Sequence, residues 1–244
     1  MRQLACLALL GALLSGCAGQ PASPDGVWIN QPIIEAARQG GSLREALLAY
    51  GPNLEWQVDS QRGLATYSNG FELGEGQLVA LEPGHWRVDY HGDFHELLSL
   101  SGEQLHQQAS DNGPEQHFSH PAQPAAADAP PGSSFEWALY DAYLGGTWKI
   151  REGVGQGGLV LFHPDGSLEG FPGAERYALC LAGDCAAMSG EHDSLWLQLG
   201  QQGNTWIFER DGDQLLIREA LNRAQPDEMP DFQPGRQVWL LERD

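Results

Sequence analysis

The sequence predicts an all-β protein with a short helical insertion, built from two tandem small domains that are antiparallel β-barrels or sandwiches. Apolar side chains at every second position, as in residues 195–199, are typical of strands with one buried face. Turn sequences such as residues 164–166 and 211–213 separate these short segments. Both halves also open alike, with a Gly-x-Trp motif that ends at Trp28 and at Trp148. About eight short strands in each half suit a small barrel or a two-sheet sandwich.

The N-terminus carries a targeting signal. Arg2 supplies a positive charge, residues 4–14 form an apolar segment too short for a retained membrane span, and small residues lead to Cys17. The segment Leu-Leu-Ser-Gly-Cys17 resembles the lipobox of bacterial outer-membrane lipoproteins. The resemblance implies that residues 1–16 are a removed signal peptide and that Cys17 carries the lipid, palmitate included. An ordinary signal peptide with a chance cysteine is the alternative.

The residue after the lipidated cysteine gives the destination. In typical diderm bacteria an aspartate at this position keeps lipoproteins at the inner membrane, whereas this chain has Ala18. The resemblance therefore implies the outer membrane, with the body in the periplasm or at the cell surface. Residues 17–25 are small, polar and proline-containing, which predicts a lipidated, flexible tether.

The first domain is predicted over residues 26–120, with a helical insertion at 32–50. Pro32 suits the first turn of a helix, and Ser42 with Glu45 forms a capping-box pattern that opens a second helical segment. The apolar side chains of this second segment share one helical face. We interpret that face as a lid over an open barrel end.

A linker and a second domain follow. Residues 121–134 are rich in proline and alanine and contain no aromatic residue, which predicts a semi-rigid linker. Residues 135–244 form the second domain, in which a strand is predicted at 186–189.

The Gly-x-Trp motif at the start of each half is similar to the opening motif of lipocalin-like barrels. In that family the tryptophan closes the barrel base and packs beside an arginine from the last strand. Trp148 and Arg243 fit this pattern, whereas residues 117–120 stand in place of the arginine that would partner Trp28. The segment 161–170 also resembles the strand-turn-strand of small secreted META-type domains, which are compact β-folds. Both resemblances imply tandem small β-domains.

Two cysteines remain once the leader is removed and Cys17 is lipidated. Cys180 and Cys185 flank a Gly-Asp turn sequence, and in an oxidising compartment this spacing predicts a local disulfide that pins a hairpin. A redox-active pair or part of a metal site are the alternatives.

Charge restricts the partners. The formal charge is −20, and removal of residues 1–16 takes away Arg2 and no acid, which makes it −21. Such a balance disfavours nucleic acid and anionic lipid headgroups, and it favours cationic partners.

Histidines are the first candidates for chemistry, because six of them lie between positions 85 and 120. His91, Asp93 and His95 alternate and would share one face of an unbroken strand, where they could hold a metal ion. The same residues also read as a turn, across which a metal could still be held with Glu96 or another histidine. A turn at the surface is the simpler interpretation.

Other catalytic patterns are weak. Glu72 and Glu75 are two acids among many, and Glu191, His192 and Asp193 are adjacent residues, which point apart and do not form a proton relay. No phosphate loop, dinucleotide fingerprint or nucleophile elbow is present in the sequence, so we expect no cofactor.

Three functions remain open at this point. The favoured one is a lipid-anchored, non-enzymatic binding or envelope-maintenance module with a protein partner in the envelope. The second is lipocalin-like carriage of a small apolar ligand, for which Trp28, Trp148 and Arg243 would line the cavities. The third is a metal-binding or metal-dependent hydrolytic domain.

Overall fold

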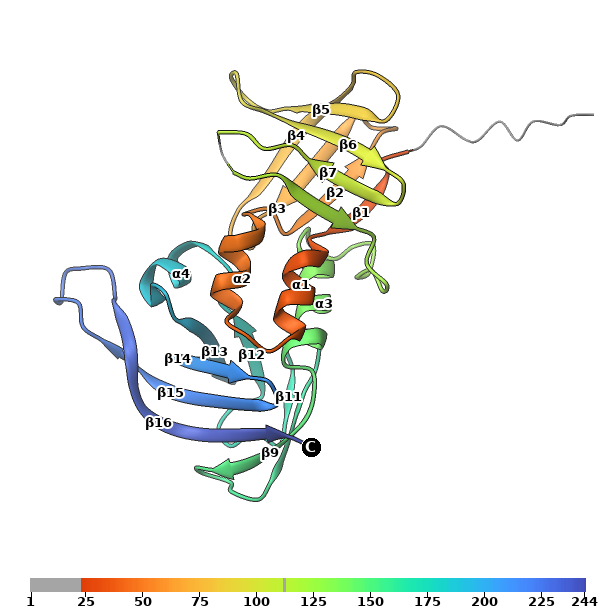
Figure 1. Cartoon of the computed structure of the whole chain (residues 1–244). Coiled ribbons are helices and arrows are strands. Elements are labelled where there is room, and N and C mark those ends of the chain that lie inside the picture. The colour runs from red at the N-terminus through yellow and green to blue at the C-terminus, as the bar shows by residue number, and fades with distance from the viewer. Residues whose placement is uncertain (1–22, 112) are drawn as a thin grey trace, which may run out of the picture.

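A computed structural model describes residues 23–111 and 113–244; the lipobox and Cys17 lie outside the described residues. Two antiparallel β-structures of eight strands each lie at opposite ends of the molecule, and helices lie between them (Figure 1). The predicted fold class, tandem all-β barrels with a helical insertion, is confirmed.

The first structure is a closed up-and-down barrel in which consecutive strands are neighbours. It closes where Ile29 of the first strand pairs with Ser119 of the last. Its strands are β1 Gly26–Ile29, β2 Glu55–Asp59, β3 Leu64–Ser68, β4 Leu73–Ala80, β5 His85–Asp89, β6 His95–Ser101, β7 Gln104–Gln107 and β8 Gln116–Ser119.

The second structure is an eight-stranded sheet. The strands that come first and last along the chain in this half pair with each other in the middle of the sheet. Its two edge strands, β11 and β12, approach through a single bridge between Ser167 and Arg176, which gives the sheet its barrel-like form. Its strands are β9 Gly146–Glu152, β10 Leu159–Phe162, β11 Leu168–Glu169, β12 Arg176–Leu179, β13 Asp193–Leu199, β14 Gln202–Asp211, β15 Gln214–Asn222 and β16 Phe232–Arg243.

Two of the four described helices follow from the sequence. The insertion forms α1 Gln31–Arg38, which has Pro32 in its first turn, and α2 Leu43–Tyr50. The predicted cap is present, because the Ser42 side chain accepts a hydrogen bond from the Glu45 backbone N–H at 3.2 Å.

The other two helices were not predicted. The end of the linker continues into α3 Ser133–Tyr143. The segment predicted as a strand at 186–189 belongs to α4 Gly183–Ser189, so that prediction is wrong. A short run of small and apolar residues does not distinguish a strand from a helical turn by its periodicity.

The disulfide between Cys180 and Cys185 is confirmed. Its expected role is wrong, because Cys180 follows β12 and Cys185 lies in α4. The bond therefore ties the end of a strand to a helix and does not pin a hairpin.

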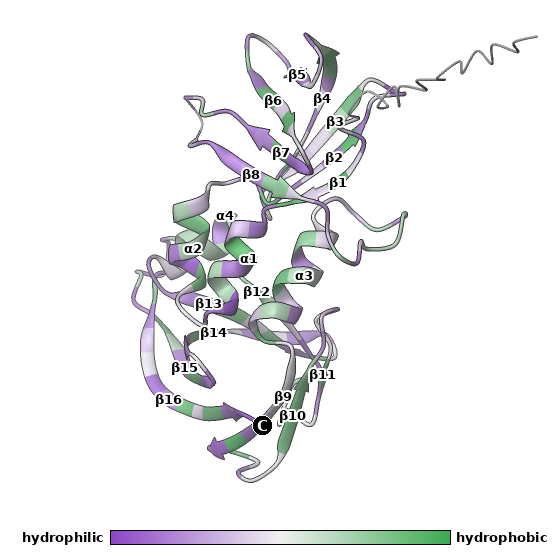
Figure 2. Cartoon of the chain, turned by 45° about the vertical axis from the view of Figure 1, so that its right-hand side comes forward, coloured by the Kyte–Doolittle hydropathy of each residue, from purple (hydrophilic) through white to green (hydrophobic). Residues whose placement is uncertain are grey.

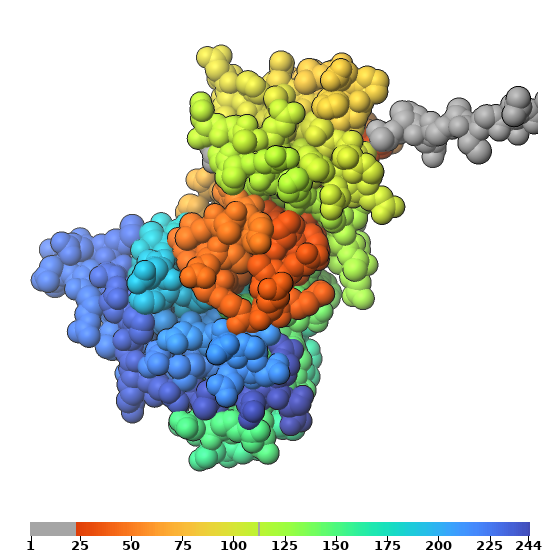
Figure 3. Space-filling view, viewed as in Figure 1, coloured from red at the N-terminus to blue at the C-terminus, as the bar shows by residue number. Residues whose placement is uncertain are grey.

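The helices of the first half belong to the core of the second. The buried faces of α1 and α2 join one hydrophobic cluster with α3 and the second sheet, whereas the interior of the first barrel forms a separate cluster. In the space-filling view α1 and α2 fill the waist between the two β-structures (Figure 3). Along the strands and helices, hydrophobic and hydrophilic residues alternate, as amphipathic elements with one buried face require (Figure 2). The second sheet is thus completed by helices that precede the linker.

The two halves cap each other's helices. Glu55 of β2, only 1% exposed, accepts hydrogen bonds at 2.9 Å from the backbone N–H groups of Gly132 and Phe135 at the start of α3. Asp193 of β13 accepts hydrogen bonds from the backbone N–H groups of Leu43 at 2.8 Å and Arg44 at 2.6 Å, at the start of α2. Acidic side chains at helix N-termini satisfy free donors and complement the helix dipole. Each half therefore supplies an acid to the helix of the other.

Within the residues that the structure describes, no helix combines the length and the apolar character needed to cross a bilayer.

Candidate functional site

The Gly-x-Trp motifs close the two β-structures in the same way. Trp28 donates its indole N–H to the carbonyl of Pro24, and Trp148 donates its own to the carbonyl of Leu144, both at 2.7 Å. In each case the acceptor lies four residues upstream. Both tryptophans are buried, at 2% and 0% exposure. These side chains pack and seal the barrels.

Each tryptophan is covered by a side chain from the end of its half. The Arg243 guanidinium lies 4.6 Å from the centre of the Trp148 ring. The ring of His120 stacks on Trp28 at 3.7 Å and donates from Nδ1 to the carbonyl of Val27 at 2.8 Å. His120 thus takes in the first barrel the place that Arg243 takes in the second. The sequence showed that the arginine was replaced, but not which residue replaced it.

The interior of the first barrel holds a cluster of buried apolar side chains. Trp56, Trp86 and Phe118 are among its buried aromatic side chains. At the end near the helices, buried amides close the barrel, with Asn53 donating from Nδ2 to Gln107 Oε1 at 2.9 Å. Cavity residues for an apolar ligand were expected at Trp28, Trp148 and Arg243, and the structure places all three in closing contacts.

One carboxyl group lies inside this barrel. Glu96 of β6 is 2% exposed; its Oε1 accepts a hydrogen bond from the Ser110 hydroxyl at 3.2 Å, and its Oε2 has no partner among the described residues. Burial raises the pKa of Glu96, against the effect of hydrogen bonds from Gln107 and Ser110. Tyr67 and Tyr90 lie close enough that the charge of Glu96 helps to raise the pKa of each phenol.

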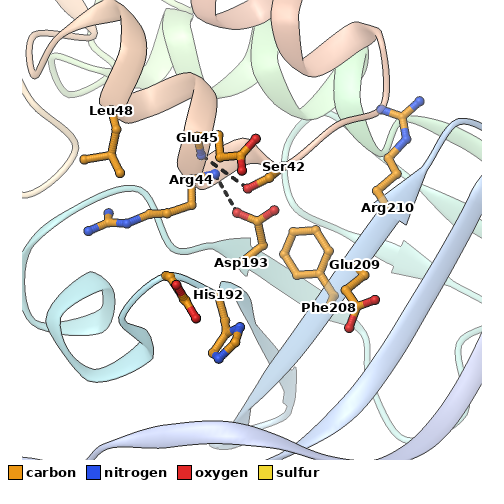
Figure 4. A pocket seen from close by; sticks show the side chains of 10 residues that line it. Ser42, Arg44, Glu45, Leu48, His192, Asp193, Phe208, Glu209 and Arg210 are labelled. Carbon is orange, nitrogen blue, oxygen red and sulfur yellow. Dashed lines mark hydrogen bonds between the residues drawn. The ribbon is translucent and has the colours of Figure 1, made fainter.

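A surface hollow of about 540 Å³ lies beside the first turn of α2 (Figure 4). The Asp193 carboxylate points to the start of the helix. On the other side Arg210 donates to the carbonyl of Ala37 at 3.1 Å and lies over the ring of Tyr143. The charged groups at its base therefore hold α1 and α2 on the second sheet.

The rim of this hollow is acidic. Glu45, Glu191 and Glu209 line it and are exposed. Glu191, His192 and Asp193 do not form a proton relay in the structure, because the Asp193 carboxylate faces α2. The nearby Ser189 hydroxyl donates its hydrogen bond to the Ser194 hydroxyl. Arg44 and Arg210 also line the hollow, so its four acids, Asp193 included, outnumber its two arginines.

The histidines predicted as metal candidates do not converge. His91 follows β5 in a turn, and His95 begins β6, where it pairs with Asp89. Asp93 contributes its backbone carbonyl, not its carboxylate, to a contact with His95. Among the described residues, the three ligand-type side chains that lie within reach of one ion are different from this set.

That group is His106, Glu115 and His117 on the outer face of the first barrel. His106 on β7 and His117 on β8 are direct partners in the strand register. Glu115 Oε1 lies 3.8 Å from His106 Nδ1 and 3.8 Å from His117 Nε2. Sequence spacing alone did not single out this set, because the loop between the strands leaves their register open.

No known protein family model matches the chain, and no curated protein sequence is similar to it.

Proposed function

We propose that the protein is a lipid-anchored, non-enzymatic module of the bacterial outer membrane that binds a cationic protein partner in the envelope. Cys17 carries the anchor, and the residues up to Asp25 form the tether. The body stands in the periplasm or at the cell surface.

One observation carries this proposal: the reciprocal caps of Glu55 on α3 and Asp193 on α2 join both β-structures and the helices between them. A joined body of this kind keeps a fixed outer surface, and preorganised surfaces lose little entropy on binding. The acidic rim of Glu45, Glu191 and Glu209, together with the formal charge of −20, favours a cationic partner.

Carriage of a small apolar ligand ranks lower in this proposal. Trp28 and Trp148 are buried in packing contacts and do not line a cavity wall that a ligand could reach. The amide contacts near Asn53 close one end of the first barrel. An apolar ligand needs an apolar cavity, whereas the hollow beside α2 is lined by charged side chains.

The anchor is tested by replacing Cys17. We expect the full-length protein to be labelled by radioactive palmitate and to sediment with the outer membrane. The Cys17→Ser variant should lose the label and the membrane association, because the acyl chains supply the anchoring free energy.

The matched control is Cys6→Ser, which removes the other leader cysteine and should leave both label and sedimentation unchanged. A Cys17→Ser protein that still carries palmitate or still sediments with membranes would contradict the proposal.

A further inference from the structure

We propose that His106, Glu115 and His117 form a binding site for a divalent transition metal ion of the zinc type. The site lies on the outer face of the first barrel, away from the acidic hollow beside α2. It adds a function that the proposed anchoring and partner binding do not require.

The strands aim both histidines outward. Their neighbours Leu105 and Phe118 are each 0% exposed and belong to the barrel core. Because side chains alternate along a strand, His106 and His117 project to the opposite, outer face. Residues directly opposite each other on antiparallel strands have Cβ atoms about 4.5–5.5 Å apart. The barrel wall therefore presents two imidazoles side by side on a rigid support.

The spacing of the ligand atoms suits an ion. Zinc bonds to nitrogen and oxygen of about 2.0–2.2 Å in a tetrahedron place neighbouring ligand atoms about 3.3–3.6 Å apart. Glu115 Oε1 is 3.8 Å from a nitrogen of each histidine, so a small closing movement reaches that geometry. The same distances exceed those of hydrogen bonds. The carboxylate thus stands between the two rings, at equal distance from a nitrogen of each.

The orientation of the rings supports convergence. The two imidazoles are nearly perpendicular, at 86°, with their centres 4.5 Å apart. The planes of perpendicular rings intersect, and the candidate ligand atoms of the two histidines and Glu115 all lie within 4.8 Å of one another.

The donor set indicates the metal class. Two imidazoles and one carboxylate are ligands typical of zinc and its neighbours, whereas calcium and magnesium prefer oxygen ligands alone. The carboxylate supplies negative charge, and the acidic body attracts cations. Glu115 and His117 are 59% and 45% exposed, which leaves an entry path and a fourth position open to water.

Zinc titration of the intact chain tests the site. The full-length protein is purified in detergent without a polyhistidine tag, stripped with a chelator and titrated with zinc chloride in a calorimeter. We expect one zinc ion per chain. The double variant His106→Ala/His117→Ala should bind zinc more than tenfold more weakly (about 1.4 kcal/mol for each factor of ten).

The matched control is His91→Ala/His95→Ala, which removes two exposed histidines from the same barrel and should retain zinc binding. Glu115→Gln provides a milder test, because its exposed side chain can be changed without disturbing the barrel core, and it should also weaken binding. Equal losses in the test and control variants, or no zinc binding by the unmodified chain, would overturn the proposal. In that case Glu115 serves only as an ion-pair partner of the two histidines.

Discussion

Replacing Glu55 by alanine is expected to lower the free energy of unfolding by about 3 kcal/mol, because two buried N–H groups at the start of α3 lose their acceptor. Each unpaired buried donor costs about 1–3 kcal/mol. The carboxylate is buried and also accepts a hydrogen bond from Gln57 at 2.9 Å, so water does not readily replace it. Urea denaturation followed by tryptophan fluorescence measures the change.

The control for this variant is Glu75→Ala, which removes an exposed acid from β4 of the same barrel. Such surface substitutions change stability by about 0.5 kcal/mol or less. A Glu55→Ala protein as stable as this control would show that the cap on α3 does not support the fold.

Replacing Asp193 by alanine is expected to cost about 2 kcal/mol, because the first turn of α2 loses the acceptor for two backbone N–H groups. The loss should loosen α1 and α2 from the second sheet, and hydrogen exchange of their amides should rise first. The control is Asp211→Ala, at an exposed position near the end of β14. Unchanged exchange in α2 of the Asp193→Ala variant would contradict the expectation.

The conservative variant Asp193→Asn gives a pH test. Burial raises the pKa of Asp193 above its ordinary value of 3.8, against the backbone hydrogen bonds that lower it. The Asp193 carboxyl therefore binds its proton more tightly in the folded protein than in the unfolded chain. As a result, the contribution of Asp193 to the free energy of unfolding falls as pH rises from 3.8 through the raised pKa. The stability deficit of Asp193→Asn relative to the unmodified protein should shrink over the same range.

The sequence pattern predicts those features that depend on neighbouring residues. The Ser42 cap of α2 and the disulfide between Cys180 and Cys185 follow from short spacings. The contact of Arg243 with Trp148 joins the last strand of the second half to its first strand, so short spacings do not predict it. The resemblance to lipocalin-like barrels predicts this contact.

Features that depend on the packing of distant segments were not predicted. The location of α1 and α2 on the second sheet requires tertiary contacts that no local periodicity encodes. The same holds for Glu55 and Asp193, which cap helices far away in the chain. The pairing of His106 with His117 depends on strand register, which the loop between them determines.

Cleavage of the linker tests most directly whether the two β-structures and the helices form one unit. A protease site inserted between the exposed residues Ala127 and Asp128 allows the folded protein to be cut after purification. Because α1 and α2 of the first piece complete the core of the second, we expect both pieces to elute together from a sizing column and to separate only in denaturant. Elution as two separate folded pieces in native buffer would contradict this account.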